Sequence, residues 1–211
     1  MKNFITFEGG EGCGKSTVIQ EMKEYCEKHN IDYLATREPG GLKECEQIRT
    51  ILKSSPLSPK TQLLLFSASR SHLCENSIVP ALKEGKIVFC DRFFDSTRVY
   101  QGYCGQLSDE TIMQITDIAV GDCKPEITFF LDIDPVEAFK RKGGYDKGDV
   151  FEEAGIEFHQ KVRQGFLHLC ELEPERFVKI DATHSKEEVF NEIIEVLKRK
   201  NVINAWFCFK S

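Results

Sequence analysis

The sequence predicts a three-layer α/β domain, with a mainly parallel sheet covered by helices on both faces. Five short apolar runs, rich in β-branched and aromatic residues, are continuous rather than alternating, which is typical of strands buried on both faces. Longer helical segments separate these runs, and right-handed crossovers place such helices on both sides of the sheet. The 211 residues fit one compact domain, 1–211.

The expected strands cover residues 3–8, 31–36, 86–91, 126–133 and 176–181. The expected helices cover 15–30, 61–84, 108–121, 153–172 and 185–200. The first helix places Val18, Met22 and Cys26 on one apolar stripe, which is the face that would pack on the sheet. Open α/β sheets bind ligands at the carboxyl ends of their strands, so residues that follow the strands are the first candidates for a site.

Composition and charge narrow the classes of partner. The chain has 28 Lys and Arg against 34 Asp and Glu, and this net charge of -6 disfavours nucleic acid and anionic membranes. No apolar run is long enough to span a bilayer, and the N-terminus lacks the pattern of a signal peptide, so we expect a cytoplasmic protein. The nine cysteines show no CxxC pair and no zinc spacing, which predicts free thiols in a reducing compartment.

The segment after the first expected strand has the phosphate-binding pattern GxxxxGK[ST]. It runs from Gly9 to Ser16 and opens the first expected helix, which is the context that confirms the pattern. Its glycines let backbone N–H groups surround an anion, and the helix N-terminus adds its dipole. Lys15 would reach the terminal phosphates of a nucleoside triphosphate, and Ser16 would bind Mg²⁺. The sequence therefore predicts a P-loop NTPase fold with a nucleotide site made of Gly10, Glu11, Gly12, Cys13, Gly14, Lys15, Ser16 and Thr17.

The residues that follow the next strands favour a kinase. The chain lacks the NKxD and DxxG motifs of GTPases, and its length favours a small kinase over a nucleic-acid motor. Asp91 ends the third expected strand, where a second carboxylate that organises Mg²⁺ belongs, and Arg92 follows it. Arg37 follows the second strand and Arg49 lies on the next helix. Arginine binds phosphate in a bidentate manner, so Arg37, Arg49 and Arg92 together indicate a second, accepting phosphate.

Several stretches, spread in order over most of the chain, resemble the bacterial thymidylate kinase family. They are FITFEGGEGCGKST, TREPGG, LLLFSASR, DRFFDST followed by YQG, and LDIDP. The resemblance implies a five-stranded parallel sheet, a homodimer, and transfer of the γ-phosphoryl group of ATP to dTMP with Mg²⁺. It also assigns the three arginines to the acceptor phosphate, with Arg92 beside the transferred group.

The same resemblance assigns the residues that would hold the base and sugar of dTMP. Phe66 corresponds to the ring that stacks on thymine, although its place in an apolar run is equally typical of a core residue. Arg70, four residues later on the same helix face, corresponds to the residue that binds a thymine carbonyl. Thr97 and Gln101 correspond to polar contacts with the base edge. Tyr100 corresponds to the side chain that crowds a ribose 2′-OH and so favours deoxyribose.

A charged, glycine-containing segment, 140–153, is predicted to be a mobile lid over the site. Family members without an arginine in the P-loop take the missing cation from this lid, and the P-loop here has none. The position where such lids commonly carry arginine is Val150, which departs from the pattern. We therefore expect Arg141 or Lys147, with Lys142 as a further candidate, to contact the ATP phosphates and act in catalysis.

Two bulkier residues of the P-loop carry their own predictions. Glu11 corresponds to the carboxylate that faces the acceptor sugar, where it would accept a hydrogen bond from the 3′-OH or contact the metal shell. Glu8, at the end of the first strand, is expected to be structural or a distant metal ligand through water. Cys13 is expected to be an exposed thiol beside a helix N-terminus, so alkylation would block activity and ATP would protect it.

Two other functions remain compatible with the sequence. The first is a kinase for another nucleoside monophosphate, such as dUMP or UMP, since Arg70, Thr97 and Gln101 favour a pyrimidine without proving a methyl pocket. The second is a catalytically silent nucleotide-binding P-loop protein, which the departure at Val150 motivates.

Overall fold

The computed structural model describes residues 1–143 and 154–203. At its centre is a five-stranded sheet in the order β2-β3-β1-β4-β5, and every neighbouring pair is parallel. The strands are β1 (Phe4–Glu8), β2 (Tyr33–Arg37), β3 (Ile87–Asp91), β4 (Ile127–Asp132) and β5 (Phe177–Asp181). The fold class predicted from the sequence is confirmed, because the continuous apolar runs are the buried strands of a parallel sheet.

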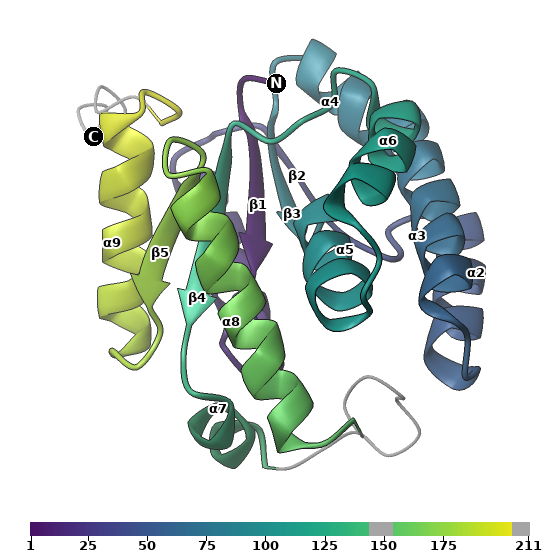
Figure 1. The fold of residues 1–211 in the computed structure, drawn as a ribbon. Helices are drawn as coiled ribbons and strands as arrows, with labels where there is room; N and C mark the ends of the chain where they lie inside the picture. The colour runs from purple at the N-terminus through teal and green to yellow at the C-terminus, as the bar shows by residue number, and fades with distance from the viewer. Residues whose placement is uncertain (144–153, 204–211) are drawn as a thin grey trace.

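Helices cover both faces of this sheet (Figure 1). They are α1 (Lys15–Lys28), α2 (Lys43–Ser54), α3 (Pro59–Leu73), α4 (Val79–Lys83), α5 (Phe94–Thr97), α6 (Asp109–Val120), α7 (Pro135–Lys142), α8 (Ile156–Leu172) and α9 (Lys186–Arg199). One face packs against α1 and α9, which also contact each other. The other face packs against α3, α5 and α8, with α6 and α2 beside α3. The three layers leave the carboxyl ends of the strands open at one end of the molecule.

The expected helix at 61–84 is interrupted by a π-helical turn, η1 (Cys74–Ile78), between α3 and α4. Pro80 follows this turn and has no backbone N–H to donate, so the regular hydrogen-bond ladder cannot continue through it. A second π-helical segment, η2 (Arg98–Cys104), continues α5. The sequence did not predict the helical stretch formed by α5 and η2, which begins two residues after Arg92.

Helix α7 was also not predicted, and it includes the start of the expected lid. Asp134 caps its N-terminus by accepting from the Val136 N–H, at 2.9 Å, and Pro135 occupies the first turn. Gly143, with φ of 87°, ends the helix. Residues 140–142 are therefore the last turn of a helix, whereas the rest of the predicted lid lies outside the described residues.

Two global expectations can be compared with the described residues. Within 1–143 and 154–203, no helix combines the length and apolar character needed to cross a bilayer. All eight cysteines in these ranges are free thiols, as predicted, and six of them are buried.

Candidate active site

The P-loop connects β1 to α1 and wraps around the N-terminus of α1. Gly12 has φ of 72°, and a Cβ atom there would lie 2.6 Å from the carbonyl oxygen of Ala138 in α7. Only glycine tolerates both this conformation and this close approach. The loop is therefore held between the sheet and α7, with the first N–H groups of α1 directed at the space where an anion would bind.

Lys15 is folded back over the loop that carries it. Its Nζ donates to the carbonyl oxygens of Gly9 and Gly10, at 3.2 and 2.9 Å, and to Cys13 Sγ at 3.5 Å. The side chain is 7 % exposed. The ammonium group is thus kept at the mouth of the P-loop by weak neutral acceptors, which phosphate oxygens would replace with stronger, charge-assisted bonds.

Cys13 does not have the predicted exposure. Its side chain is 5 % exposed and joins the hydrophobic cluster that contains Phe7, Leu131 and Ala138. A Cβ atom at Gly9 would lie 2.7 Å from Cys13 Sγ, so the thiol fills the space beneath that glycine. The expectation of an exposed, reactive thiol is wrong, because the loop turns this side chain toward the sheet rather than toward the nucleotide space.

Arg92 joins the P-loop to the loop that follows β3. Its Nη1 donates to the Gly9 carbonyl oxygen at 3.0 Å and to Ser96 Oγ at 3.2 Å, and its Nη2 donates to Glu11 Oε1 at 2.6 Å. Burial opposes ionisation of Glu11, but Arg92 and Lys15 outweigh it and lower the pKa of this carboxyl group to about 2. Glu11 is therefore ionised throughout the physiological range.

Glu8 holds the loop that positions Arg92. It is fully buried at the end of β1, and its Oε1 accepts from the N–H groups of Phe93 and Ser96 at 2.8 and 3.2 Å. Its Oε2 accepts from Ser96 Oγ at 2.6 Å. Arg92 itself has φ of 67°, a conformation that is costly for a non-glycine residue and needs such support. The contacts of Glu8 are those of a structural residue.

A network of ion pairs joins the segment after Arg92 to the loop that precedes β5. Asp95 is fully buried and accepts from Arg176 Nη1 and Nη2 at 2.6 and 2.8 Å. Arg98 in turn donates to Asp109 from Nε and Nη2, both at 2.9 Å, and also pairs with Glu173. A buried carboxylate is retained at low cost only when paired in this way. The segment 92–98 is thus anchored on both sides.

The two residues predicted to bind Mg²⁺, Asp91 and Ser16, line the same cavity. Asp91 ends β3, and its buried Oδ1 accepts no hydrogen bond from any residue within 1–143 and 154–203. Ser16 is exposed at the start of α1. One carboxylate oxygen without a partner and one hydroxyl suit Mg²⁺ that is held mainly by phosphate oxygens and water. The described ranges contain no cluster of three His, Cys, Asp or Glu side chains that would form a protein-only metal cage.

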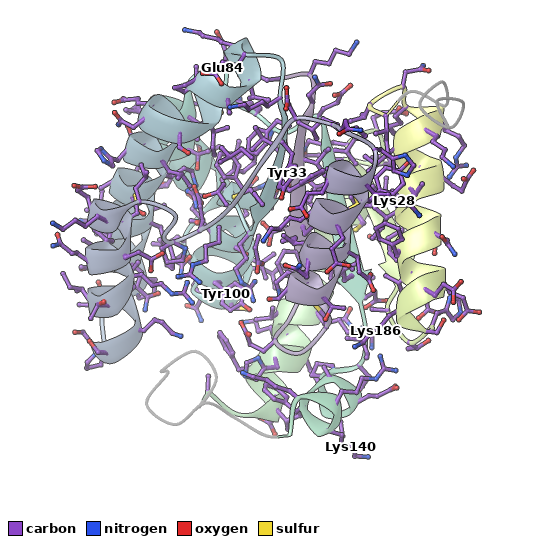
Figure 2. All side chains as sticks on the ribbon, turned by 180° about the vertical axis from the view of Figure 1, so that it is seen from behind. Lys28, Tyr33, Glu84, Tyr100, Lys140 and Lys186 are labelled. Carbon is purple, nitrogen blue, oxygen red and sulfur yellow. The ribbon has the colours of Figure 1, made fainter. Side chains whose placement is uncertain are left out.

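Two cavities meet at the pair formed by Arg92 and Glu11. The larger cavity, about 610 Å³, is lined by the P-loop, Asp91, Arg141 and Lys186, and has the size and basic lining that a nucleoside triphosphate needs. The smaller cavity, about 90 Å³, lies between α2, α3 and the segment after β3. It contains most of the predicted acceptor residues, namely Glu11, Arg49, Phe66, Arg70, Arg92, Thr97, Tyr100 and Gln101. Figure 2 shows Tyr100 and Lys186 toward the same end of the molecule, away from Glu84.

Arg70 is held by a buried carboxylate that the sequence analysis missed. Its Nε donates to Glu38 Oε2 at 2.8 Å and its Nη2 donates to Thr97 Oγ1 at 3.0 Å. Both members of the ion pair are buried, at 1 % and 3 % side-chain exposure. Burial raises the pKa of Glu38 to about 7, although Arg70 opposes the shift. Arg70 Nη1 keeps no partner among residues 1–143 and 154–203, so one donor of the guanidinium is left over.

The aromatic residues are placed on two walls of the smaller cavity. Phe66 is half-buried on α3, one turn before Arg70, and therefore lines the cavity rather than the core. Tyr100, on η2, lines the same cavity, and the guanidinium carbon of Arg92 is 5.5 Å from the centre of its ring. Burial raises the pKa of the Tyr100 hydroxyl above its usual range, so this side chain is neutral.

The other two arginines of the predicted trio have different surroundings. Arg49 Nη1 donates to the Pro39 carbonyl oxygen at 3.0 Å, and Arg49 lines both cavities. Arg37 lines only the larger cavity, and its Nη2 donates to Glu46 Oε1 at 2.9 Å while its side chain is 53 % exposed. Arg49 and Arg92 are thus placed at the junction of the two cavities, and Arg37 at its rim.

The predicted lid cations are only partly within the described residues. Arg141 lines the larger cavity, but its Nη1 donates to the Ala182 carbonyl oxygen at 2.7 Å and its Nη2 to that of Thr183 at 3.1 Å. Lys142 lies beside the P-loop, where a Cβ atom at Gly12 would be 3.4 Å from its Cβ. Lys147 and Val150 lie outside the described residues.

Comparisons with known proteins show the family of the chain. The family model described as thymidylate kinase matches residues 7–193. The thymidylate kinase of Dehalococcoides mccartyi is 46% identical over 196 residues, which cover 92% of this chain and 94% of the relative. That of Finegoldia magna is 42% identical over 204 residues, covering 95% of this chain and 100% of the relative.

A solved structure shows the same likeness in three dimensions. The crystal structure of thymidylate kinase from Ehrlichia chaffeensis superposes with a TM-score of 0.76 at 34% identity, and covers 92% of this chain and 97% of that chain. The two chains therefore share the fold over almost their whole length. The chain belongs to the thymidylate kinase family.

Proposed function

We propose that the chain transfers the γ-phosphoryl group of ATP to the phosphate of dTMP, giving ADP and dTDP. The observation that carries this proposal is the junction of the two cavities at Arg92 and Glu11. A triphosphate in the larger cavity and a monophosphate in the smaller one would approach each other at this guanidinium. Phosphoryl transfer needs mainly such positioning and neutralisation of charge.

Each group at the junction then has a separate role. Lys15 contacts the terminal phosphates of ATP, and Arg92 stabilises the phosphoryl group during transfer. Arg49 and Arg37 bind the acceptor phosphate, which is anionic at neutral pH and needs no general base. Glu11 accepts a hydrogen bond from the sugar 3′-OH. Arg141 or Lys147 supplies further positive charge from the lid.

A bound Mg²⁺ would supply positive charge to the phosphates of ATP. Ser16 and Asp91 are the residues that would hold it, as the unpartnered Oδ1 of Asp91 within the described ranges supports. The acceptor pocket supports a nucleotide with a planar base, because the aromatic side chains of Phe66 and Tyr100 both line it.

We also propose a cytoplasmic homodimer. Three large apolar side chains are exposed on neighbouring helices, Ile51 on α2, Leu64 on α3 and Ile118 on α6, at 47%, 51% and 86%. Exposed apolar side chains on neighbouring helices support a contact between copies of the chain. Free thiols throughout the described residues suit a reducing compartment such as the cytoplasm.

An assay of ADP release over a panel of monophosphates tests the reaction. We expect turnover of ATP that requires an acceptor. The value of kcat/KM should be highest for dTMP, lower for dUMP, and lower still for UMP and purine nucleotides. A preference for dUMP or UMP would support the alternative kinase. ATP turnover without an acceptor preference, or no turnover at all, would contradict the proposal, and the latter would favour a silent nucleotide-binding protein.

A further inference from the structure

A hydrogen-bond relay reaches the acceptor pocket from outside it. Gln62 lies on α3, four residues before Phe66 and eight before Arg70, so the three side chains share one helix face. Gln62 Nε2 donates to the Leu57 carbonyl oxygen at 3.1 Å. Gln62 Oε1 accepts from Gln101 Nε2 at 2.9 Å. The relay therefore runs from a backbone carbonyl through two amides to the wall of the pocket.

The relay fixes which end of the Gln101 amide faces the base. A backbone carbonyl can only accept a hydrogen bond. The Gln62 amide therefore has a single allowed orientation, with Nε2 toward the Leu57 carbonyl oxygen. Its Oε1 must then face Gln101, which requires the nitrogen of Gln101 at that contact. Gln101 Oε1 is left as an acceptor, and none of the residues 1–143 and 154–203 donates to it.

Two side chains that line the pocket thus keep one donor and one acceptor that a base could bind. Arg70 Nη1 is the donor without a partner in the described ranges, and Gln101 Oε1 is the acceptor. The imide edge of thymine or uracil has an acceptor at O4 and a donor at N3–H, which is complementary. Cytosine has a donor at N4 and an acceptor at N3, so both contacts would be mismatched.

We propose that Gln62 is a positioning residue that fixes the Gln101 amide through the Leu57 carbonyl, and thereby makes the pocket selective for 4-oxo over 4-amino pyrimidine nucleotides. This inference rests on the proposed function, because it takes the smaller cavity to be the acceptor site. Gln62 itself does not line that cavity, and it acts only through Gln101.

Replacing the relay residue tests the proposal. Gln62→Leu removes both contacts and leaves the Gln101 amide able to reverse. The dissociation constants for dTMP, dUMP and dCMP can be measured by calorimetry. The dissociation constant for dCMP divided by that for dTMP should be about tenfold lower than in the wild type, which is the scale of one lost hydrogen bond. The ratio of dUMP to dTMP should stay within about twofold, since both bases have the same imide edge.

A second variant separates the relay from a merely structural role. Gln62→Glu still accepts from Gln101 Nε2, so it should keep the discrimination against dCMP. Gln20→Leu, a change at an exposed glutamine on α1, is the matched control and should leave all three constants unchanged. If Gln62→Leu does not fold, Gln62→Met removes the same hydrogen bonds with an unbranched, helix-favouring side chain.

The possible outcomes are distinct. An unchanged ratio of dCMP to dTMP in Gln62→Leu or its Met substitute overturns the role of Gln62, as does an equal loss in Gln62→Glu. Loss of affinity for all three nucleotides by one common factor also overturns it, because that result indicates only a disturbed pocket. Failure of the wild-type chain to bind dTMP would instead contradict the proposed function, and with it this inference.

Discussion

Arg92 Nη2 lies 2.6 Å from Glu11 Oε1, and this ion pair joins two loops that are 81 residues apart in sequence. The pair lies where the larger and the smaller cavities meet. Arg92 and Lys15 lower the pKa of Glu11 to about 2, against the effect of burial, so Glu11 is ionised at neutral pH.

Arg92→Lys should lower kcat by about 10² to 10³-fold, the usual cost of losing a preorganised group that stabilises transferred charge. Lysine cannot bond the Gly9 carbonyl, Ser96 and Glu11 at once, because it lacks the planar fork of arginine. Steady-state kinetics would measure the change, with Arg199→Lys at the exposed end of α9 as control. An increase in KM alone would mean that Arg92 contributes only ground-state binding.

Stability should depend on pH through Glu8. Burial, followed by the charge of Asp95, raises the pKa of Glu8 from 4.5 to about 7, while Arg92 and the hydrogen bonds from Ser96 and Phe93 oppose the shift. The folded chain then binds more protons than the unfolded chain between these values. The free energy of unfolding should therefore fall as pH rises from about 4.5 to 7, and the cost of the ionised group is fully present above that window.

Glu8→Gln should remove this pH-dependent change in the free energy of unfolding, which amounts to as much as about 3 kcal/mol over the whole window. Urea denaturation of both proteins between pH 5 and 8 would measure it. Glu192→Gln, at an exposed position of α9, should leave the slope unchanged. A slope as steep in Glu8→Gln as in the wild type would show that Glu8 is not its source.

Cys13 should resist alkylation in the folded chain, since its thiol is buried beneath Gly9. Among the cysteines of 1–143 and 154–203, iodoacetamide should label the half-exposed Cys104 and Cys170 first. The labelling should be slow, because burial raises the pKa of their thiols to about 11 and about 12. Mass spectrometry of the peptides would give the order. Rapid labelling of Cys13 that ATP prevents would contradict the burial of this thiol and support the exposure expected from the sequence.

The lid cations can be tested one at a time by Arg141→Ala, Lys142→Ala and Lys147→Ala. We expect at least one of the Arg141 and Lys147 changes to lower kcat by about 10²-fold, because a cation on the transferred phosphoryl group acts mainly in the transition state. Lys140→Ala is the control, since this exposed side chain lies on the same helix and points away from the body of the molecule (Figure 2). Values of kcat near wild type in all three variants would show that the lid does not supply the charge.

Ile118→Glu should convert the proposed dimer to a monomer, because it places a charge in the apolar face of α2, α3 and α6. Light scattering coupled to size-exclusion chromatography would give the mass. Leu172→Glu, at an exposed apolar residue of α8 away from this face, should leave the mass unchanged. A wild-type chain that elutes as a monomer would contradict the proposal directly.

The sequence alone predicted the parts of the fold and site that local chemistry determines. The glycines, Lys15 and Ser16 identified the P-loop because that pattern has a meaning wherever it joins a strand to a helix. Each strand was found because an apolar run of that length in an α/β pattern has few other uses. Phe66 and Arg70 were expected to share a helix face because they are four residues apart, and both line the smaller cavity.

Tertiary structure decided the contacts between residues that are distant in sequence. Cys13 was expected to be exposed, but the packing of the P-loop against α7 and the sheet buries it. Glu38 and Gln62 gave no signal of their own, because each acts through a partner on another element, Arg70 or Gln101. A side chain's orientation depends on which donors and acceptors surround it, and only the folded chain brings those groups within hydrogen-bond distance.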